Sequence, residues 1–398
     1  MRIVLAALVA ACAAAQQPSF TLDQILSAPF PSSLTQSPAG AVAWVSSVRG
    51  VRNVMLAEPP EYRPRKLTGY TEDDGQEIGD LRWADGALVY MRGGTANPES
   101  RPSGVAEEIW LVAIKGSAPR KLGEGNSPAV SPKGDRVAWI RGASVWSAPV
   151  DGTPAQAFAA RGILSHPVWS PDGARLAFTS TRGDHSFIGV FDVAANSLRY
   201  LDPSTDLDSY PEWSPDGRNI AFVRIPSTGK RAVREAQRAG EPWCIRVADA
   251  STGAGREIWR AKRGAGSVFR GINARNQLLW ADGGRIVFPW EGDGWTHLYS
   301  VAAAGGVCDS VFARSATSRS AGTSVTGNQS VIPSRQTSVS SLIRPLRRAT
   351  TISAVLISAM SPSLMFTHQS SLRPVLGPPA RVASSLGVPA ALADGASH

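Results

Sequence analysis

One five-residue motif recurs along the chain and limits the folds that the chain can adopt. Trp-Ser-Pro-Asp-Gly occurs at Trp169–Gly173 and again at Trp213–Gly217, and a short apolar segment follows each copy. Four weaker copies keep the same frame, at Ser37–Gly40, Trp83–Gly86, Val130–Gly134 and Trp280–Gly283. A unit that recurs in this way predicts a fold built from structural repeats.

The chemistry of the motif predicts a tight turn. Ser, Pro and Asp favour the first three positions of a type I turn, and the Gly that follows adopts a positive φ without steric cost. Such a turn closes a β-hairpin. The apolar residues after the turn are typical of a strand packed between two sheets, and the Trp before it offers a large apolar surface to a neighbouring sheet.

The spacing of the copies indicates the architecture. Pro132 and Pro171 lie 39 residues apart, and Pro171 and Pro215 lie 44 residues apart. Within each interval a second apolar segment ends in another turn, as at Asp151-Gly152. Two hairpins in a period of about 40 residues make a four-stranded blade. We therefore predict an all-β chain that forms a β-propeller of about six four-stranded blades over residues 20–306.

The interval between Pro215 and Trp280 is longer than the others, at 65 residues. Its surplus includes the stretch 229–239, which is rich in helix formers. We predict an insertion near residues 225–242 that projects from one blade. It is either a solvated basic helix or an element that gates access of a substrate or docks a partner.

The composition changes abruptly after Gly306. Residues 307–398 contain no Trp, Tyr, Glu or Lys, and eight Arg against two acidic residues give this segment +6 of the chain's net charge of +9. One interpretation is a disordered Ser- and Arg-rich tail. We favour a shifted reading frame near Gly306, which would leave a disordered or misfolded tail unrelated to the propeller.

Because the blades show no basic stripe with interleaved aromatic residues, we expect no nucleic-acid partner.

The first residues have the layout of a secretory signal. Met1-Arg2 is followed by an apolar run from Ile3 to Ala11 and by small residues before Gln16,. We expect a signal peptide over residues 1–15, cleavage near Ala15, and a secreted or periplasmic protein. One alternative is a lipoprotein signal in which Cys12 carries a lipid anchor, and another is a buried amino-terminal strand. The chain has no apolar run of the length that spans a bilayer.

No residue pattern typical of a catalytic, cofactor or metal site stands out. The histidines are scattered without metal-ligand spacing, at His166, His185, His297, His368 and His398,. The acidic stretch Glu72–Asp74 lacks the alternating pattern of a calcium loop, and we predict a solvated turn there. The three cysteines, Cys12, Cys244 and Cys308, suggest no disulfide framework, and the apolar surroundings of Cys244 predict a packed thiol,. We therefore predict no catalytic, metal-binding or cofactor-binding residue and no cofactor.

Three longer segments, Phe20–Pro31, Asp73–Ile78 and most closely Arg285–Tyr299, resemble one family. They are similar to secreted bacterial members of the prolyl oligopeptidase family, the dipeptidyl-peptidase-IV-like branch of serine peptidases. The resemblance covers roughly residues 20–306. The hairpin motif alone fits propellers of the TolB type equally well.

The resemblance implies a propeller that covers an α/β-hydrolase domain, whose catalytic serine lies in a Gly-x-Ser-x-Gly turn. The chain contains no Gly-x-Ser-x-Gly, and we expect it to be truncated before that domain and inactive, so no catalytic residue is transferred. The paired glutamates that bind the substrate's amino terminus in dipeptidyl peptidase IV have no counterpart, since Glu235 and Glu241 are not adjacent.

By the same resemblance, the propeller would restrict access to short peptides, which are the expected ligands. The family would require seven or eight blades, so six motif copies predict an incomplete propeller that is prone to aggregation. The alternative function is a TolB-type periplasmic propeller that acts as a protein-binding scaffold.

Overall fold

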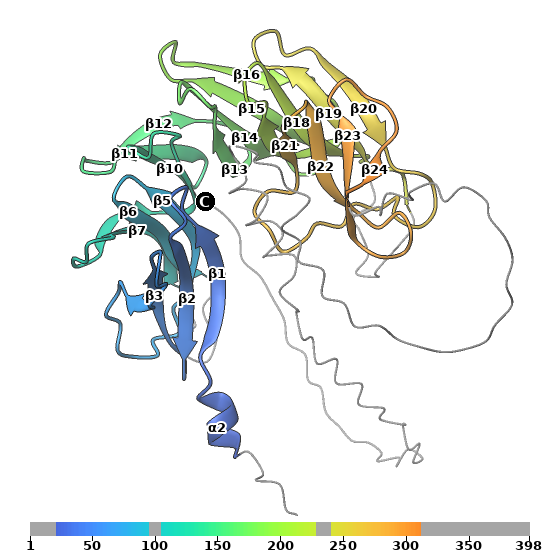
Figure 1. The fold of residues 1–398 in the computed structure, drawn as a ribbon. Helices are drawn as coiled ribbons and strands as arrows, with labels where there is room; N and C mark the ends of the chain where they lie inside the picture. Colours follow the sequence, from blue (N-terminus) through green and yellow to red (C-terminus); the bar gives the residue numbers. More distant parts are fainter. Residues whose placement is uncertain (1–20, 95–104, 228–239, 312–398) are drawn as a thin grey trace, which may run out of the picture. The chain divides into compact units, whose positions relative to one another are not determined.

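The computed structural model describes residues 21–94, 105–227 and 240–311, and their secondary structure is almost entirely β (Figure 1). The predicted signal peptide, the stretch 228–239 of the predicted insertion and the chain from residue 312 onwards lie outside the described residues. The one described helix, α2 (Leu22–Leu26), begins after Thr21, which forms a capping box with Gln24,. No described helix is long and apolar enough to cross a membrane.

The described strands form six antiparallel units of four strands, which we call blades one to six. Blades one to three consist of β1 (Phe30–Gln36), β2 (Val42–Val48), β3 (Val51–Ala57) and β4 (Arg65–Lys66); β5 (Ile78–Ala84), β6 (Ala87–Gly94), β7 (Val105–Ala113) and β8 (Arg120–Glu124); and β9 (Asn126–Val130), β10 (Arg136–Arg141), β11 (Ser144–Pro149) and β12 (Ala155–Ala159). Blades four to six consist of β13 (Ile163–Trp169), β14 (Arg175–Thr181), β15 (Ser186–Asp192) and β16 (Ser197–Leu201); β17 (Leu207–Trp213), β18 (Asn219–Ile225), β19 (Cys244–Asp249) and β20 (Gly255–Arg260); and β21 (Leu279–Ala281), β22 (Arg285–Trp290), β23 (His297–Ala302) and β24 (Asp309–Ser310).

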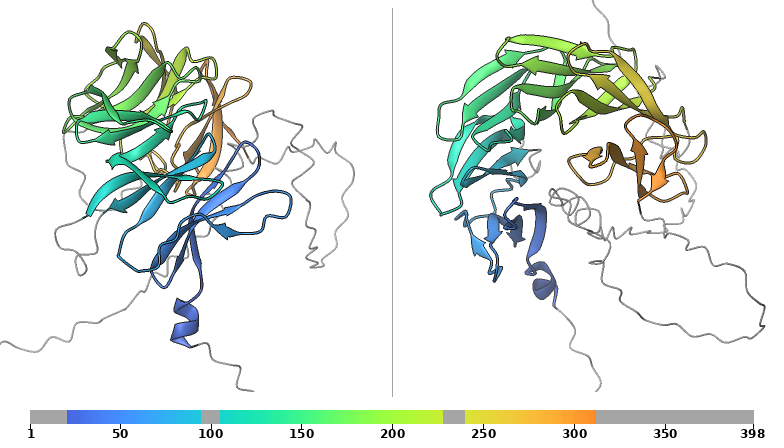
Figure 2. Two further views of the ribbon diagram at one scale, coloured as in Figure 1. Left: turned by 90° about the vertical axis from the view of Figure 1, so that its left-hand side faces the viewer. Right: turned by 45° about the horizontal axis from the view of Figure 1, so that its top comes forward.

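Within each blade the strands pair in chain order. One parallel contact, Ser186 with Leu207, also links β15 of blade four to β17 of blade five. The views in Figure 2 show the blades following one another in the order of the sequence. The predicted all-β propeller of four-stranded blades is confirmed.

Each copy of the motif forms the turn between the first and second strands of one blade. In the copy at Trp169–Gly173, the Ser170 hydroxyl oxygen accepts a hydrogen bond from the Arg175 amide at 2.9 Å, and Gly173 has a φ of +73°. The Ser170 hydroxyl also donates to Asp172, the Asp of the motif. In the copy at Val130–Gly134 this Asp is replaced by Lys133, and the Ser131 hydroxyl donates to Asp135 at 2.7 Å. Both serines therefore have a carboxylate partner, at different positions in the sequence.

The hydrophobic core is divided among the spaces between neighbouring blades. One cluster of buried side chains joins blades one and two, and others join two to three, three to four, four to five, and five to six. The Trp of the motif also bonds to the preceding blade: the Trp169 indole donates to Ala129 O at 3.2 Å and the Trp213 indole to Val168 O at 3.1 Å. The predicted contact of this Trp with a neighbouring sheet is confirmed.

The long interval before Trp280 contains a second surplus segment besides the stretch 228–239. It is the connection 261–278 from β20 to β21, whose residues fold back against other parts of the propeller. The sequence did not single out this connection, because its composition matches that of an ordinary surface loop.

Candidate functional site

The first strand of five blades carries a β-bulge at the same place. The bulge residue has a positive φ although it is not glycine, and it lies four residues before the Ser position of the motif, at Ser33, Asp80, Ser127, His166 and Tyr210. The pairing register shifts at each of these positions. Non-glycine residues with positive φ are uncommon and often occur at functional sites. In blade six the same position is Gln277, which lies just before β21 begins.

The bulges of blades four and five line a small pocket with the segment that precedes β21. Its walls are His166 and Val168 from β13, the segment Tyr210–Glu212 from β17, and the segment Arg275–Leu278. We call five of the polar residues that line this pocket the inner cluster: His166, Tyr210, Glu212, Arg275 and Asn276. The free space is about 10 Å³, which is room for about one water molecule,.

His166 is the most unusual member of the inner cluster. Its Nδ1 atom is buried and has no hydrogen-bond partner among the described residues, and its ring lies 4.5 Å from the Tyr210 ring. Burial lowers the pKa of His166, while the charge of Asp80 on the blade-two bulge acts to raise it. The lowered pKa makes the imidazole neutral at pH 7, so it can both donate and accept a hydrogen bond.

Glu212 is also neutral at pH 7, because burial disfavours its charged form as well. Burial raises the pKa of its carboxyl group to about 8, against the stabilising effect of a hydrogen bond from the Trp280 amide. The Asn276 side-chain amide also donates to its Oε2 at 3.4 Å. At pH 7 the carboxyl group is protonated, and it can donate as well as accept.

Arg275 brings a charged group to the bulges of blades three and four. Its guanidinium donates to Pro128 O at 2.8 Å and to Pro167 O at 3.0 Å. Both prolines lie within bulges, at residues that have no partner in the strand register. The arginine therefore satisfies carbonyl groups that the sheets leave unpaired.

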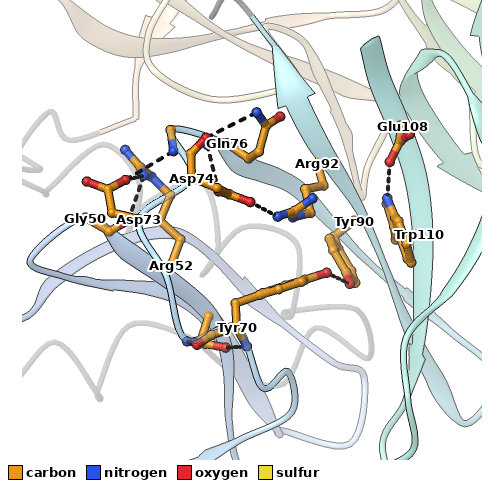
Figure 3. A network of polar contacts seen from close by, with 12 residues as sticks. Gly50, Arg52, Tyr70, Asp73, Asp74, Gln76, Tyr90, Arg92, Glu108 and Trp110 are labelled. Atoms are coloured by element: carbon orange, nitrogen blue, oxygen red, sulfur yellow. Dashed lines mark hydrogen bonds and ion pairs between the residues drawn. The ribbon is translucent and has the colours of Figure 1, made fainter. Parts of the chain in front are cut away.

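The acidic turn at Glu72–Asp74 is solvated, as expected, with the Asp73 side chain 54% exposed, and it also forms ion pairs. Asp73 lies 3.5 Å from Arg52 of blade one, and Asp74 pairs with Arg92 of blade two (Figure 3). Arg92 in turn lies 4.5 Å above the ring of Tyr70. These ion pairs give Asp73 and Asp74 a role in joining the first two blades.

The other residues considered from the sequence lie apart from the inner cluster. His185 lies 2.8 Å from Asp184, and His297 lies 3.5 Å from Asp293. Cys244 is buried in β19, where burial raises the pKa of its thiol to about 12, as expected of a packed thiol.

Glu241 forms a surface ion pair with Arg263 at 3.3 Å. Cys308 is partly buried beside β24. The residues Cys12, Glu235, His368 and His398 lie outside the described part of the chain.

Sequence reasoning placed His166 among the scattered histidines and missed the other members of the inner cluster. A usable signal existed: counting back four residues from the Ser position of the motif, which is Ala84 in the second copy, reaches every bulge residue. No such count finds Arg275, because it precedes β21 in a segment without a counterpart in the other blades.

No family model matches the chain, and no curated protein matches it. Solved structures are similar to it at low identity. A prolyl endopeptidase structure is 10% identical, covers 75% of this chain and 46% of its own, and has a TM-score of 0.51. Puromycin hydrolase is 18% identical, covers 72% of this chain and 46% of its own, and also has a TM-score of 0.51. TolB from Acinetobacter baumannii is 16% identical, covers 69% of this chain and 61% of its own, and has a TM-score of 0.41.

The matched region spans about half the length of the prolyl endopeptidase and of puromycin hydrolase. At these identities the likeness establishes the propeller fold and nothing finer.

Proposed function

We propose that this propeller is the non-catalytic region of a secreted serine peptidase of the prolyl-oligopeptidase type, and that it limits access to short peptides. In this proposal the catalytic triad belongs to an α/β-hydrolase domain. The segment Arg285–Tyr299, which resembles that family most closely, forms β22, the following loop and the start of β23 in blade six. The likeness to a prolyl endopeptidase and to puromycin hydrolase is compatible with the same role.

The inner cluster is the observation that carries the proposal. His166 and Glu212 are both neutral at pH 7, and each can donate and accept a hydrogen bond. A peptide backbone presents alternating donors and acceptors without charge, and neutral partners can bind it without burying an unpaired ion. The chemistry of these side chains therefore suits a peptide.

A TolB-type scaffold that binds folded proteins is the second candidate, because the hairpin motif fits both kinds of propeller. The two candidates differ in the size of the ligand. In the peptidase proposal the ligand is a short peptide, whereas a scaffold would bind a folded domain.

Calorimetric titration of the purified chain with a tetrapeptide, Ala-Ala-Pro-Ala, tests the proposal. We expect binding that weakens about tenfold or more in His166→Ala and in Glu212→Ala, because each change removes a hydrogen-bonding group from the inner cluster. Glu61→Ala, at an exposed carboxyl, is the control and should bind like the wild type. Absence of peptide binding contradicts the peptidase proposal, and binding of a folded domain alone favours the scaffold.

A chromogenic dipeptide substrate tests the non-catalytic role separately. We expect no turnover by the purified chain. Turnover that a serine-directed inhibitor abolishes would contradict the proposal that catalysis belongs to another domain.

Export is part of the proposal and has its own test. The mass of the mature amino terminus should correspond to cleavage near Ala15, or to a lipid on Cys12 if the lipoprotein route is used. An intact Met1 on the protein recovered from bacterial cells would contradict export.

A further inference from the structure

The connection from β20 to β21 is fixed at its base to blades five and six. Gly266 O accepts hydrogen bonds from two indole groups, that of Trp243 at 3.2 Å and that of Trp290 at 2.9 Å. Ser267 is fully buried, and its hydroxyl oxygen accepts from the Gly240 amide at 2.7 Å. Phe269 packs against Trp243. The base of the connection is therefore part of the rigid core.

The tip of the connection is closed by one buried side chain. Gln277 donates to Ile272 O at 3.0 Å and to Ala274 O at 2.7 Å, and its side-chain oxygen accepts from the Ile272 amide at 2.9 Å. A Cβ atom on Gly271 would lie 2.8 Å from that oxygen, so a larger residue does not fit there without a shift. These contacts hold Arg275 at the tip of a compact loop.

Arg275 joins this loop to blades that are distant in the sequence. Its two carbonyl acceptors, Pro128 and Pro167, lie 147 and 108 residues before it. The guanidinium presents several N–H groups in a fixed plane, so one side chain can hold two carbonyls at once. Both acceptors are neutral, and carbonyl or carboxylate groups of a ligand could replace them.

The volume of the pocket indicates how the contact between Arg275 and the bulges affects access of a ligand. The free space between the loop, β13 and β17 is about 10 Å³, whereas sites for small ligands usually measure hundreds of cubic ångströms,. A water molecule fits, but a dipeptide does not. A ligand larger than a water molecule that occupies this pocket must first displace the segment that contains Arg275 and Asn276.

We propose that the tip of this connection, residues 271–277, forms an internal strap, latched by Arg275, that covers His166, Tyr210 and Glu212 and has to release before a ligand binds to them. The latch follows from the contacts of this chain. The identity of the ligand as a short peptide rests on the proposed function.

Hydrogen–deuterium exchange of the purified chain tests the latch. In Arg275→Ala we expect the amides of residues 271–277 to exchange about tenfold faster or more, because two hydrogen bonds from a charged donor are lost. The base at residues 264–268 should keep its protection. Arg275→Lys keeps the charge but loses the planar fork, and it should lie between Arg275→Ala and the wild type.

Arg263→Ala is the matched control, since Arg263 belongs to the same connection but forms only a surface pair with Glu241. It should exchange like the wild type. Unchanged exchange at 271–277 in Arg275→Ala overturns the proposal. An increase spread equally over all blades shows a general loss of stability in Arg275→Ala. In that case the local increase at 271–277 must be seen in Arg275→Lys, and its absence there overturns the proposal.

The rate of binding of Ala-Ala-Pro-Ala tests the gating role of the strap. We expect the association rate constant to rise about tenfold in Arg275→Ala and to stay unchanged in Arg263→Ala. Equal rates in Arg275→Ala and the wild type overturn the gating role. If the peptide binds to no variant, the proposed function fails, and the exchange experiment alone decides whether the latch exists.

Discussion

Asp208 and Glu212, two carboxyl residues of β17, differ in their hydrogen-bond partners and in their protonation state at pH 7. Asp208 is fully buried and accepts two hydrogen bonds from Arg224, at 2.6 and 2.8 Å, and Arg224 also contacts Asp202 at 3.3 Å. Burial raises the pKa of Asp208 to about 6, which still leaves it ionised at pH 7 beside its arginine. Among the described residues, Glu212 receives hydrogen bonds from the Trp280 amide and the Asn276 side chain, both uncharged, and it keeps its proton. The difference gives the first residue a structural role and leaves the second available for binding.

The raised pKa of Glu212 predicts a dependence of stability on pH. The folded state holds this proton up to about pH 8, whereas an ordinary Glu loses it near pH 4.5. Between these values the folded state binds more protons than the unfolded state, so the free energy of unfolding falls as pH rises, by at most about 1.4 kcal/mol per pH unit. Glu212→Gln cannot ionise and should lose this fall.

Urea unfolding of the wild type and Glu212→Gln between pH 5 and pH 9 measures the effect. The variant should gain stability relative to the wild type as pH rises, and Glu61→Gln, at an exposed carboxyl, should show no such trend. A difference between Glu212→Gln and the wild type that stays constant with pH would contradict the assignment.

The Arg224 ion pair should contribute strongly to folding. Arg224→Ala leaves the Asp208 carboxylate buried without its partner, and such losses typically cost about 3–5 kcal/mol. Arg218→Ala is the control: its side chain is 83% exposed, and its loss should change the free energy of unfolding by roughly 0.5 kcal/mol or less,. Equal effects of the two changes in urea unfolding would show that the buried pair is not important.

At the level of elements, the hairpin turns could be predicted from the sequence, because four or five adjacent residues determine them. The blades followed from the spacing of those turns. The bulges were harder to predict, because the bulge residue can be Ser, Asp, His or Tyr, and no single residue type marks the position. The contact of Arg275 with Pro128 could not be predicted at all, because nothing local relates residues 147 positions apart.

Two glycines at strand connections should differ in their tolerance of a side chain. Gly173 in the motif turn has a φ of +73°, and a Cβ atom there would lie 3.6 Å from Pro132, so Gly173→Ala should cost only the backbone strain of roughly 1 kcal/mol,. Gly125, just before β9, has a φ of +134°, and a Cβ atom there would overlap the carbonyl oxygen of Ile140. We expect a larger loss for Gly125→Ala in urea unfolding. A larger loss for Gly173→Ala would contradict this ranking.

At the level of the molecule, the division of the core between neighbouring blades governs how stability is distributed. Each described cluster contains residues of two consecutive blades. In proteins with this organisation, stability is approximately a sum over units and their nearest neighbours. A destabilising substitution in one blade should therefore lower the stability mainly of that blade and of its direct neighbours.

Truncation of one core residue at a time tests this expectation. Leu81→Ala, in the cluster between blades one and two, should cost about 2–5 kcal/mol and raise hydrogen exchange mainly in those two blades,. Ile286→Ala, in the cluster between blades five and six, should show the opposite distribution. Exchange that rises equally in all blades for both variants would mean that the described propeller unfolds as one unit.

The bulges have a consequence for how such a protein could change its ligand. The turn and the core residues determine the hairpin, while the bulge position holds Ser33, Asp80, Ser127, His166 or Tyr210 in the same backbone conformation. A new side chain at His166 or Tyr210 alters the lining of the pocket while leaving the fold-determining residues in place. Under the proposed function, recognition and folding are encoded at separate positions, so that a change of preferred ligand would accumulate one residue at a time.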